Sequence, residues 1–362
     1  MRERVDRDDT VVSPSRAKAA QKAIVAWFDR ARRDLPWRRT KDPYAVWVSE
    51  IMLQQTRVET VIPYFERFMG RFPDVEELAR ADIADVLLAW SGLGYYRRAR
   101  GLHAAAREVV SRYGAKFPRT TDELRTLPGV GEYTAGAVAS IAFGERAPAI
   151  DGNVMRVVGR YIGLRADVGS TEAKRAVRAA CEALVPPVRP GDFNEALMEL
   201  GATVCSPTSP DCPSCPWRRS CRGVELGLDA VAGGPKKRAA VPRVKLIAAI
   251  VEREGAVLLA RRPLDGLFGG LGEPPLAEGP LPRARTTFAR AGIELHGKPG
   301  PRSVEHVLTH KVLEVKLATA RADAPQSLAP YTDLAYVPRS QLQATPMSTL
   351  ARRLVRVSFA DA

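Results

Sequence analysis

The stretch Leu127-Pro128-Gly129-Val130-Gly131 joins two segments whose apolar spacing predicts helices. Its glycines allow a tight turn that exposes backbone N–H groups, and the helix that follows presents its positive N-terminal end. A hairpin of this kind binds a phosphate without a charged side chain. Ordinary helix–helix connections also use glycine, so the turn alone is weak support for a phosphate site and depends on the sequence around it.

The pattern around this hairpin is helical from residue 16 to about residue 204, and no run there is typical of a strand. The segment Gly233-Gly-Pro-Lys-Lys-Arg238 is then typical of a flexible basic linker. Beyond it, the sequence predicts a helix near 283–291 and three strands, at 244–251, 256–260 and 312–318. We therefore expect an all-α part followed by a smaller α+β part.

The chain of 362 residues is too long for one ordinary core, which suggests two domains. We expect a disordered arm at the N-terminus and a linker where the composition changes. The expected boundaries are 1–15 for the arm, 16–225 for the helical domain, 226–242 for the linker and 243–362 for the second domain.

The formal net charge of +14 favours a polyanionic partner, of which nucleic acid is the commonest. A solvated basic surface is the alternative explanation. No run reaches 18 apolar residues, and the charged start of the chain lacks the apolar core of a signal peptide. We expect a cytoplasmic protein with no membrane partner.

Four cysteines form a compact cluster in which Cys205, Cys212, Cys215 and Cys221 are spaced C-x6-C-x2-C-x5-C. Cysteines of a reducing compartment are better explained as metal ligands than as disulfides. Structural zinc sites usually pair two C-x2-C units, whereas this cluster has only one, flanked by single cysteines. The spacing favours a 4Fe–4S iron–sulfur cluster, with zinc as the alternative.

Two carboxylates stand in contrasting settings. Glu50 is the only charged residue of the apolar segment 43–56, so we expect it to be buried, with a raised pKa that suits a general acid. Asp151 precedes a predicted helix at 154–161, where the helix dipole favours the ionised form. Cleavage of a glycosidic bond uses such a pair. The alternatives are a core glutamate paired with an arginine and a simple helix cap.

Ordered motifs in the first two thirds of the chain carry a family resemblance. Residues 22–222 resemble the adenine DNA glycosylases that act on A/G mismatches (MutY family), which belong to the helix-hairpin-helix superfamily. Besides the hairpin and the cysteines, the motifs are Asp34-Leu-Pro-Trp-Arg38, Trp47-Val-Ser-Glu-Ile-Met-Leu-Gln-Gln-Thr-Arg57, Trp90-Ser-Gly-Leu-Gly-Tyr-Tyr96, Ile150-Asp-Gly-Asn-Val154 and Phe193-Asn-Glu-Ala196. So many motifs in order make the resemblance specific.

The resemblance implies a reaction on double-stranded DNA that contains adenine opposite 8-oxoguanine or guanine. The adenine would be flipped out of the duplex into a pocket. By similarity, Glu50 protonates adenine N7 and Asp151 stabilises the cationic sugar. Tyr133 and Glu195 are expected to line the pocket, with Arg38 near the base.

Three further residues resemble those that fill the base stack or support the 8-oxoguanine side, namely Gln55, Leu93 and Tyr95. The alternative for Leu93 and Tyr95 is that they anchor their loop and have no role in DNA binding. The family also implies a monomer, and we expect it at the bacterial nucleoid.

Tyr133 determines the expected type of reaction. Endonuclease III-like relatives carry a lysine at this position, two residues after the second glycine of the hairpin. Without that amine no Schiff-base lyase step is expected, so we predict a monofunctional glycosylase that leaves an abasic site. The alternatives are a bifunctional pyrimidine-lesion glycosylase and a non-catalytic iron–sulfur DNA-binding sensor, although Glu50 and Asp151 argue against the sensor.

Residues 243–362 resemble, more weakly, the Nudix-like domain that this family appends. The stretch 285–293 lacks the carboxylates with which a working Nudix box holds Mg²⁺, so pyrophosphate hydrolysis is not expected. The implied role is recognition of 8-oxoguanine. The family often uses a Phe-Ser-His loop, which we align with Leu308-Thr309-His310, where the hydroxyl and imidazole are kept and the aromatic ring is not.

Overall fold

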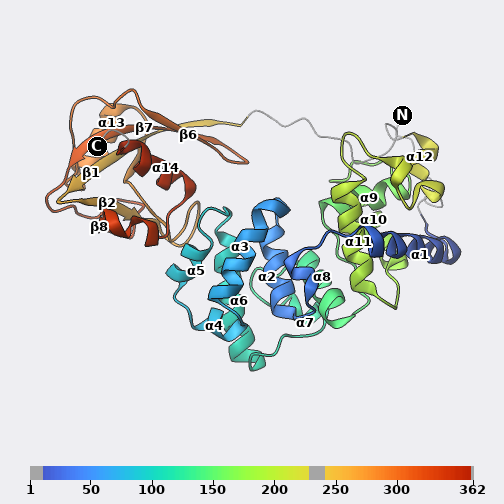
Figure 1. Cartoon of the computed structure of the whole chain (residues 1–362). Helices are drawn as coiled ribbons and strands as arrows, with labels where there is room; N and C mark the ends of the chain where they lie inside the picture. The colour runs from blue at the N-terminus through green and yellow to red at the C-terminus, as the bar shows by residue number, and fades with distance from the viewer. Residues whose placement is uncertain (1–10, 228–240, 360–362) are drawn as a thin grey trace. The chain divides into compact units, whose positions relative to one another are not determined.

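A computed structural model describes residues 11–227 and 241–359 of the chain (Figure 1). Most of the expected arm and most of the expected linker lie outside these residues. Contacts divide the chain into two compact units, Met1–Ala79 with Ala104–Lys237 and Arg80–His103 with Arg238–Ala362. A segment of helical sequence, 80–103, therefore packs with the C-terminal part of the chain.

The first unit is helical throughout its described residues, and the prediction that 16–204 contains no strand is confirmed. No helix of the described residues is long and apolar enough to cross a membrane. The helices are α1 (Pro14–Ala31), α2 (Pro43–Leu53), α3 (Val58–Arg71), α4 (Val75–Arg80), α7 (Thr121–Leu124), α8 (Glu132–Phe143), α9 (Gly152–Tyr161), α10 (Thr171–Leu184), α11 (Pro190–Thr203) and α12 (Arg222–Leu226), with the 3₁₀ turns η2 (Pro36–Arg39), η3 (Cys212–Ser214) and η4 (Arg218–Ser220).

One apolar cluster joins α1, α9, α10 and α11, with Phe28 and Phe193 among its fully buried side chains. Trp217, from the cysteine-rich loop, belongs to the same cluster, and its indole Nε1 donates to the Ala20 carbonyl at 2.9 Å. The prediction that the arm is disordered to residue 15 is wrong for its last residues, because Ser13 caps α1 and Pro14 begins it.

The predicted hairpin is present between α7 and α8. Helix α7, the first of the two helices that the hairpin joins, begins with a capping box formed by Thr120 and Glu123 and spans a single turn. Gly129 has a φ of +75°, a left-handed conformation that favours glycine, and Gly131 is the N-cap of α8. The turn therefore directs α8 and its first residues towards α2, against which it packs.

The second unit is built on one mixed sheet. Its strands follow the order β3-β2-β1-β7-β5, with β4 on β1, β6 on β7 and β8 on β2, and β1 runs parallel to β7. The elements are α5 (Ile83–Ala89), the start of α6 (Arg97–Tyr113), β1 (Arg243–Arg253), β2 (Ala256–Arg261), β3 (Gly272–Glu273), β4 (Leu276–Glu278), α13 (Leu281–Ala289), β5 (Glu294–Leu295), β6 (Ser303–Val307), β7 (Val312–Arg321), β8 (Asp333–Pro338), η6 (Arg339–Ala344) and α14 (Thr349–Ser358). The three predicted strands and the predicted helix are confirmed.

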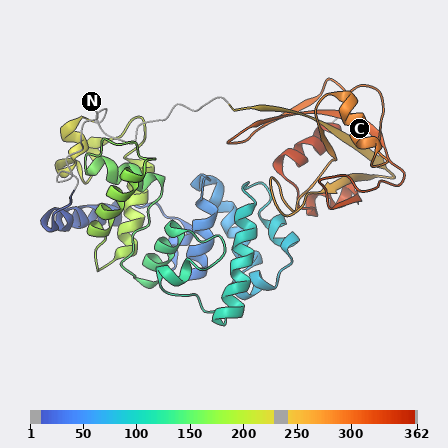
Figure 2. The same ribbon diagram turned by 180° about the vertical axis from the view of Figure 1, so that it is seen from behind.

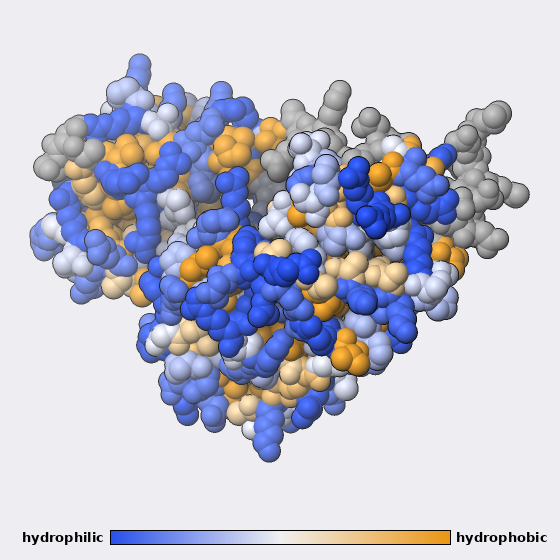
Figure 3. Space-filling view, turned by 45° about the vertical axis from the view of Figure 1, so that its right-hand side comes forward, coloured by the Kyte–Doolittle hydropathy of each residue, from blue (hydrophilic) through white to orange (hydrophobic). Residues whose placement is uncertain are grey.

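Helices α13 and α14 cover opposite faces of this sheet (Figures 1 and 2). Successive side chains of a strand point to opposite faces. Accordingly, Leu258 of β2 packs in the cluster that contains Phe288 of α13, whereas its neighbour Leu259 packs with Ala351 of α14. Hydrophilic side chains dominate the molecular surface seen in Figure 3, where apolar ones form scattered patches.

Candidate active site

Glu50 lies on α2, a helix buried on all sides from Tyr44 to Met52. The Asp42 side chain caps the helix by accepting hydrogen bonds from the amides of Tyr44 and Ala45. Only 4% of Glu50 is exposed. Burial raises its pKa to about 7, as expected from the apolar sequence around it.

Tyr133, in the first turn of α8, is the hydrogen-bond partner of Glu50. Its hydroxyl donates to Glu50 Oε2 at 2.5 Å and lies 3.0 Å from Met198 Sδ. Burial, together with the nearby carboxyl groups, holds the pKa of Tyr133 well above its ordinary value. Tyr133 therefore keeps its proton at neutral pH and orients the carboxyl group of Glu50.

Asp151 is the N-cap of α9, as the sequence predicts. Its carboxylate accepts hydrogen bonds from Val154 N at 2.7 Å and from Asn153 Nδ2 at 3.1 Å. Burial nevertheless raises the pKa of Asp151, and these hydrogen bonds only oppose that shift. The expected lowering of the pKa of Asp151 by the helix dipole is thus wrong for the protein alone, because desolvation outweighs the helix N-terminus.

Arg38 of η2 bridges two glutamates of α11. Its Nε lies 3.1 Å from Glu195 Oε1, and its Nη2 lies 2.9 Å from Glu199 Oε2. Arg33 also holds Glu199 through two hydrogen bonds of 2.7 and 2.9 Å. Burial alone would raise the pKa of Glu199, but the two arginines lower it overall, whereas burial raises that of Glu195. The cluster fixes Arg38 in place.

The structure brings together the five residues predicted to form the adenine pocket, Glu50, Tyr133, Asp151, Glu195 and Arg38. The charges of Glu195 and Asp151 raise the pKa of Glu50, and that of Arg38 lowers it, so these groups lie within electrostatic range of one another. Tyr133 is coupled to the same three carboxyl groups. Tyr133 and Asp151 are only partly buried, so the cluster reaches the surface there.

Sequence reasoning missed Glu199, which is 1% exposed and holds both arginines. Its signal was present in the sequence. Glu195 and Glu199 stand four residues apart on a helix that is otherwise largely apolar, so they share one face. Two acidic residues on a buried face need cationic partners, and the arginines near residue 38 supply them.

Two of the residues expected at the base stack have left-handed backbones. Gln55, just after α2, is exposed with a φ of +58°, and Tyr95 is 48% exposed with a φ of +48°. Strained conformations of non-glycine residues concentrate at functional sites. Leu93, in contrast, is 5% exposed, so an entry into the base stack requires it to leave its present packing.

Thr309 and His310 form the exposed tip of the hairpin between β6 and β7. The hairpin closes through Leu308 N, which donates to the Lys311 carbonyl at 2.8 Å. Thr309 Oγ1 lies 2.7 Å from the hydroxyl of Tyr95, within the second unit. The structure thus joins two residues that the sequence assigned separately to the 8-oxoguanine side.

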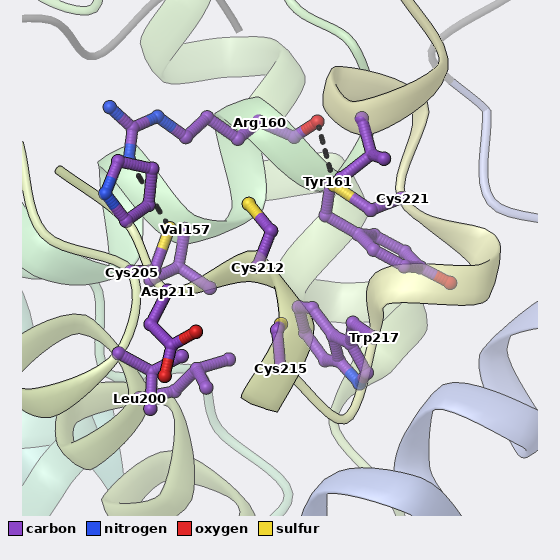
Figure 4. Close-up of a pocket in the computed structure, with 13 residues that line it drawn as sticks. Val157, Arg160, Tyr161, Leu200, Cys205, Asp211, Cys212, Cys215, Trp217 and Cys221 are labelled. Carbon is purple, nitrogen blue, oxygen red and sulfur yellow. Dashed lines mark hydrogen bonds between the residues drawn. The ribbon is translucent and has the colours of Figure 1, made fainter.

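The four predicted cysteine ligands line one pocket, and Figure 4 shows their sulfur atoms around it, with Tyr161 and Trp217 beside them. Arg160 reaches this pocket, and its Nη1 lies 3.4 Å from Cys205 Sγ. Among the described residues, no group of three or more His, Cys, Asp or Glu side chains is placed to hold a metal ion. Cys181 is buried in α10 as a core residue.

Comparison with known proteins gives two family matches. Residues 48–187 match the HhH-GPD superfamily base excision DNA repair protein, and residues 246–357 match the NUDIX domain. The chain is 42% identical over 304 residues to the adenine DNA glycosylase of Mus musculus, which covers 70% of this chain and 59% of that protein. It therefore spans somewhat over half the length of this mammalian relative.

A bacterial relative is covered more fully. The adenine DNA glycosylase of Buchnera aphidicola subsp. Baizongia pistaciae is 34% identical over 247 residues, which cover 68% of this chain and 70% of that protein. Among solved structures, a thermostable thymine-DNA glycosylase is 32% identical with a TM-score of 0.53, covering 58% of this chain and 97% of that one. A trapped endonuclease III–DNA covalent intermediate, 23% identical with a TM-score of 0.51 over 60% of this chain and all of that one, shows the shared fold alone. The chain belongs to the adenine DNA glycosylase family of the HhH-GPD superfamily.

Proposed function

We propose that this protein hydrolyses the N-glycosidic bond of adenine mispaired with 8-oxoguanine or guanine in duplex DNA and leaves an abasic site. The observation that carries the proposal is Glu50, a buried carboxyl with a pKa of about 7, hydrogen-bonded to Tyr133 and coupled to Asp151. Such a group carries a proton at neutral pH and gives it up readily, as a general acid must.

In the proposed reaction, Glu50 donates its proton to N7 of the flipped adenine. The bond between C1′ and N9 then breaks with its electron pair going to the base, which leaves as neutral adenine. The positive charge that develops on the sugar favours the ionised form of Asp151, which stabilises it. Water adds to C1′, and its proton returns to the carboxylate that Glu50 has become.

Tyr133 supports a monofunctional reaction. A lyase step needs an amine that forms a Schiff base with the sugar, and residue 133 offers a phenol that keeps its proton. This argues against the bifunctional pyrimidine-lesion alternative. Adenine is favoured over thymine because the similarity to the mouse adenine DNA glycosylase covers 70% of this chain, against 58% for the thymine-DNA glycosylase.

The second unit supplies the proposed recognition of 8-oxoguanine. Tyr95 and Thr309 meet at 2.7 Å on exposed turns, where they would contact the base opposite the adenine, with Gln55 filling the stack. Helix α13 carries no acidic residue, which supports a recognition role without pyrophosphate hydrolysis. A single chain holds both the residues proposed for adenine excision and those proposed for recognition of 8-oxoguanine. A monomer at the nucleoid is therefore sufficient for the proposed reaction.

We further propose that Cys205, Cys212, Cys215 and Cys221 hold a 4Fe–4S cluster. The donor set fits, because four thiols line one pocket walled by apolar and aromatic side chains, with the cationic Arg160 beside Cys205. When bound, the cluster would act as a structural crosslink of the loop 205–221. Arg218 and Arg219 of this loop line a surface hollow with Arg16, where they would meet phosphates.

The direct test is an analysis of products from the cluster-loaded protein and a duplex with adenine opposite 8-oxoguanine. Released base is identified by chromatography, and strand breaks are scored with and without hot alkali. We expect free adenine, with breaks only after alkali. Release of thymine from a thymine-containing duplex instead, or breaks without alkali, would contradict the proposed substrate or the monofunctional reaction, respectively.

A further inference from the structure

Residues 90–96, which we call the wedge turn, form a strained but ordered loop between α5 and α6. Gly92 and Gly94 have φ values of +102° and +75°, and Tyr95 follows at +48°. Trp90 Nε1 donates to the Gly94 carbonyl at 3.1 Å, and Gly92 N donates to the Tyr96 hydroxyl at 3.1 Å. A strained turn persists only where its surroundings hold it.

Arg98 supports the turn from within the same segment. Its guanidinium lies 5.4 Å from the ring centroids of both Trp90 and Tyr95. Its Nη2 lies 3.4 Å from the Leu93 carbonyl and 3.3 Å from that of Gly94. These contacts shape the turn, but they do not fix its place in the unit, which depends on the C-terminal part of the chain.

Helix α14 and the residues before it hold Ser91 in the wedge turn. The Ser91 hydroxyl donates to the Met347 carbonyl at 2.7 Å and accepts from Nε and Nη2 of Arg352, both at 3.3 Å. Arg352 is itself fixed, since its Nη2 also donates to the Thr345 carbonyl at 3.1 Å. One arginine thus ties the wedge turn to the start of α14.

Two further contacts hold the flanks of the wedge turn. Arg100 Nη1 donates to the Gly269 carbonyl at 3.0 Å. Gly270 packs closely on Leu87 of α5, because a Cβ at Gly270 would lie 2.8 Å from Leu87 Cδ1. Together with the contact between Tyr95 and Thr309, these interactions explain why 80–103 packs in the second unit.

We propose that Arg352 and Ser91 are positioning residues for the wedge turn, through which the C-terminal part of the chain acts on the base stack as well as on the lesion. This inference rests on the proposed function, in which the turn enters the duplex. It separates two roles of the C-terminal part. The hairpin tip at Thr309 faces the oxidised base, whereas Arg352 holds the turn that enters the stack.

The separation has a measurable consequence. Loss of Arg352 should weaken excision of adenine opposite 8-oxoguanine and opposite guanine by similar factors, because a base stack must be opened in both duplexes. Loss of the Thr309 hydroxyl should weaken the 8-oxoguanine case more than the guanine case, because it removes a group proposed to face the oxidised base as well as one contact with Tyr95 of the turn. Each effect should be roughly tenfold, the size expected when one hydrogen bond to a charged or buried group is lost.

The experiment compares the full chain with Arg352→Ala, Ser91→Ala, their double variant and Thr309→Val. Arg356→Ala is the matched control, because Arg356 is an exposed arginine on the same helix. Hydrogen exchange at the amides of 90–96 is measured beside single-turnover excision on both duplexes. We expect faster exchange at 90–96 by roughly tenfold in Arg352→Ala and Ser91→Ala. The increase in the double variant should be smaller than the two single effects combined, because both changes remove the contact between Ser91 and Arg352.

Unchanged exchange at 90–96 in both single variants, or an effect in the control of the same size, would overturn the inference. So would an excision defect of Arg352→Ala confined to the 8-oxoguanine duplex. The exchange readout does not depend on catalysis. A wild-type protein without excision activity would therefore refute the proposed function while the exchange data still decide whether Arg352 and Ser91 hold the wedge turn.

Discussion

At the scale of single residues, Glu50 and Glu199 are both buried carboxyls whose pKa values move in opposite directions. Glu199 has two guanidinium partners, Arg33 and Arg38, and its pKa falls despite burial. Glu50 has a neutral donor, Tyr133, and acidic neighbours, so burial raises its pKa to about 7. Glu50 is thus the group that holds a proton at neutral pH, while Glu199 anchors the arginines.

The first prediction concerns the pH dependence of excision. The rate should fall as pH rises through about 7, because the general acid must be protonated. Tyr133→Phe removes a hydrogen bond that lowers the pKa of Glu50, so the fall should move to higher pH. Single-turnover rates across the pH range measure both effects, with Tyr113→Phe as the control. A shift to lower pH in Tyr133→Phe would be inconsistent with this account.

The second prediction concerns stability. The pKa of Glu50 is higher in the folded protein, at about 7, than in the unfolded chain, at about 4.5. The free energy of unfolding therefore falls as pH rises from about 4.5 through about 7, because the unfolded chain releases the proton of Glu50 more readily than the folded protein does. Glu50→Gln avoids this loss. The free energy of unfolding of Glu50→Gln minus that of wild type should therefore be larger at pH 8.5 than at pH 6 by roughly 1 kcal/mol. Denaturant titrations at both pH values test this, and an equal difference at both would refute it.

The sequence allowed some of these residue properties to be predicted. The raised pKa of Glu50 could be predicted, because a helix whose residues are almost all apolar is expected to be buried on all sides. The pKa direction of Asp151 was not predictable, since it depends on how deeply a helix cap is covered by distant parts of the chain. Tertiary packing, which no local pattern contains, decides that balance.

At the scale of elements, close helix packing positions the site. Gly136 of α8 faces the segment before Asp151, where an added Cβ would lie 2.2 Å from the Pro148 carbonyl oxygen. Gly191 of α11 likewise faces α8, where a Cβ would lie 2.6 Å from Ile141 Cα. The two glycines bring the elements that carry Tyr133, Asp151 and Glu195 within reach of one another.

The third prediction tests this packing. Gly136→Ala should lower the free energy of unfolding by roughly 1–3 kcal/mol, the cost of overpacking against a fixed backbone. Gly70→Ala is the control, because Gly70 lies in α3 with open space around its Cβ position, and alanine there should stabilise the helix by about 0.5–1 kcal/mol. Thermal unfolding of both variants provides the measurement. Equal stability changes in the two variants would contradict the close approach.

The elements themselves differed in how far they could be predicted. Helices with proline or glycine at their ends, and the long strands β1, β2 and β7, followed from periodicity. Strands such as β3 and β5 contain two residues each and exist only because a distant strand pairs with them. Such elements carry no local signal, so sequence patterns miss them.

At the scale of the whole molecule, the compact units do not follow the order of the chain. The boundaries expected from composition are contiguous, whereas contacts place 80–103 in the unit that contains the NUDIX match. This segment lies within the HhH-GPD match at 48–187 and has an ordinary helical pattern. Its packing depends on contacts such as that of Ser91 with Arg352, about 260 positions apart, which composition does not reveal.

The fourth prediction concerns the net charge of +14. Duplex affinity should fall with salt, because phosphate contacts release counterions. Replacing both Arg218 and Arg219 by alanine should reduce the slope of log affinity against log salt by up to about 1.8 if each meets one phosphate. Lys174→Ala with Arg175→Ala, an exposed pair on α10, is the charge-matched control. Equal slopes for the two double variants would exclude a specific role of the cysteine-rich loop.

The central claim is that Glu50 acts as the acid in adenine excision, and one measurement tests it most directly. Single-turnover release of adenine opposite 8-oxoguanine is compared for wild type, Glu50→Gln and Glu172→Gln, the last an exposed carboxyl on α10. We predict that Glu172→Gln matches wild type and that Glu50→Gln is slower by at least about 100-fold, as expected when a general acid is removed. Release by Glu50→Gln at the wild-type rate would contradict the account.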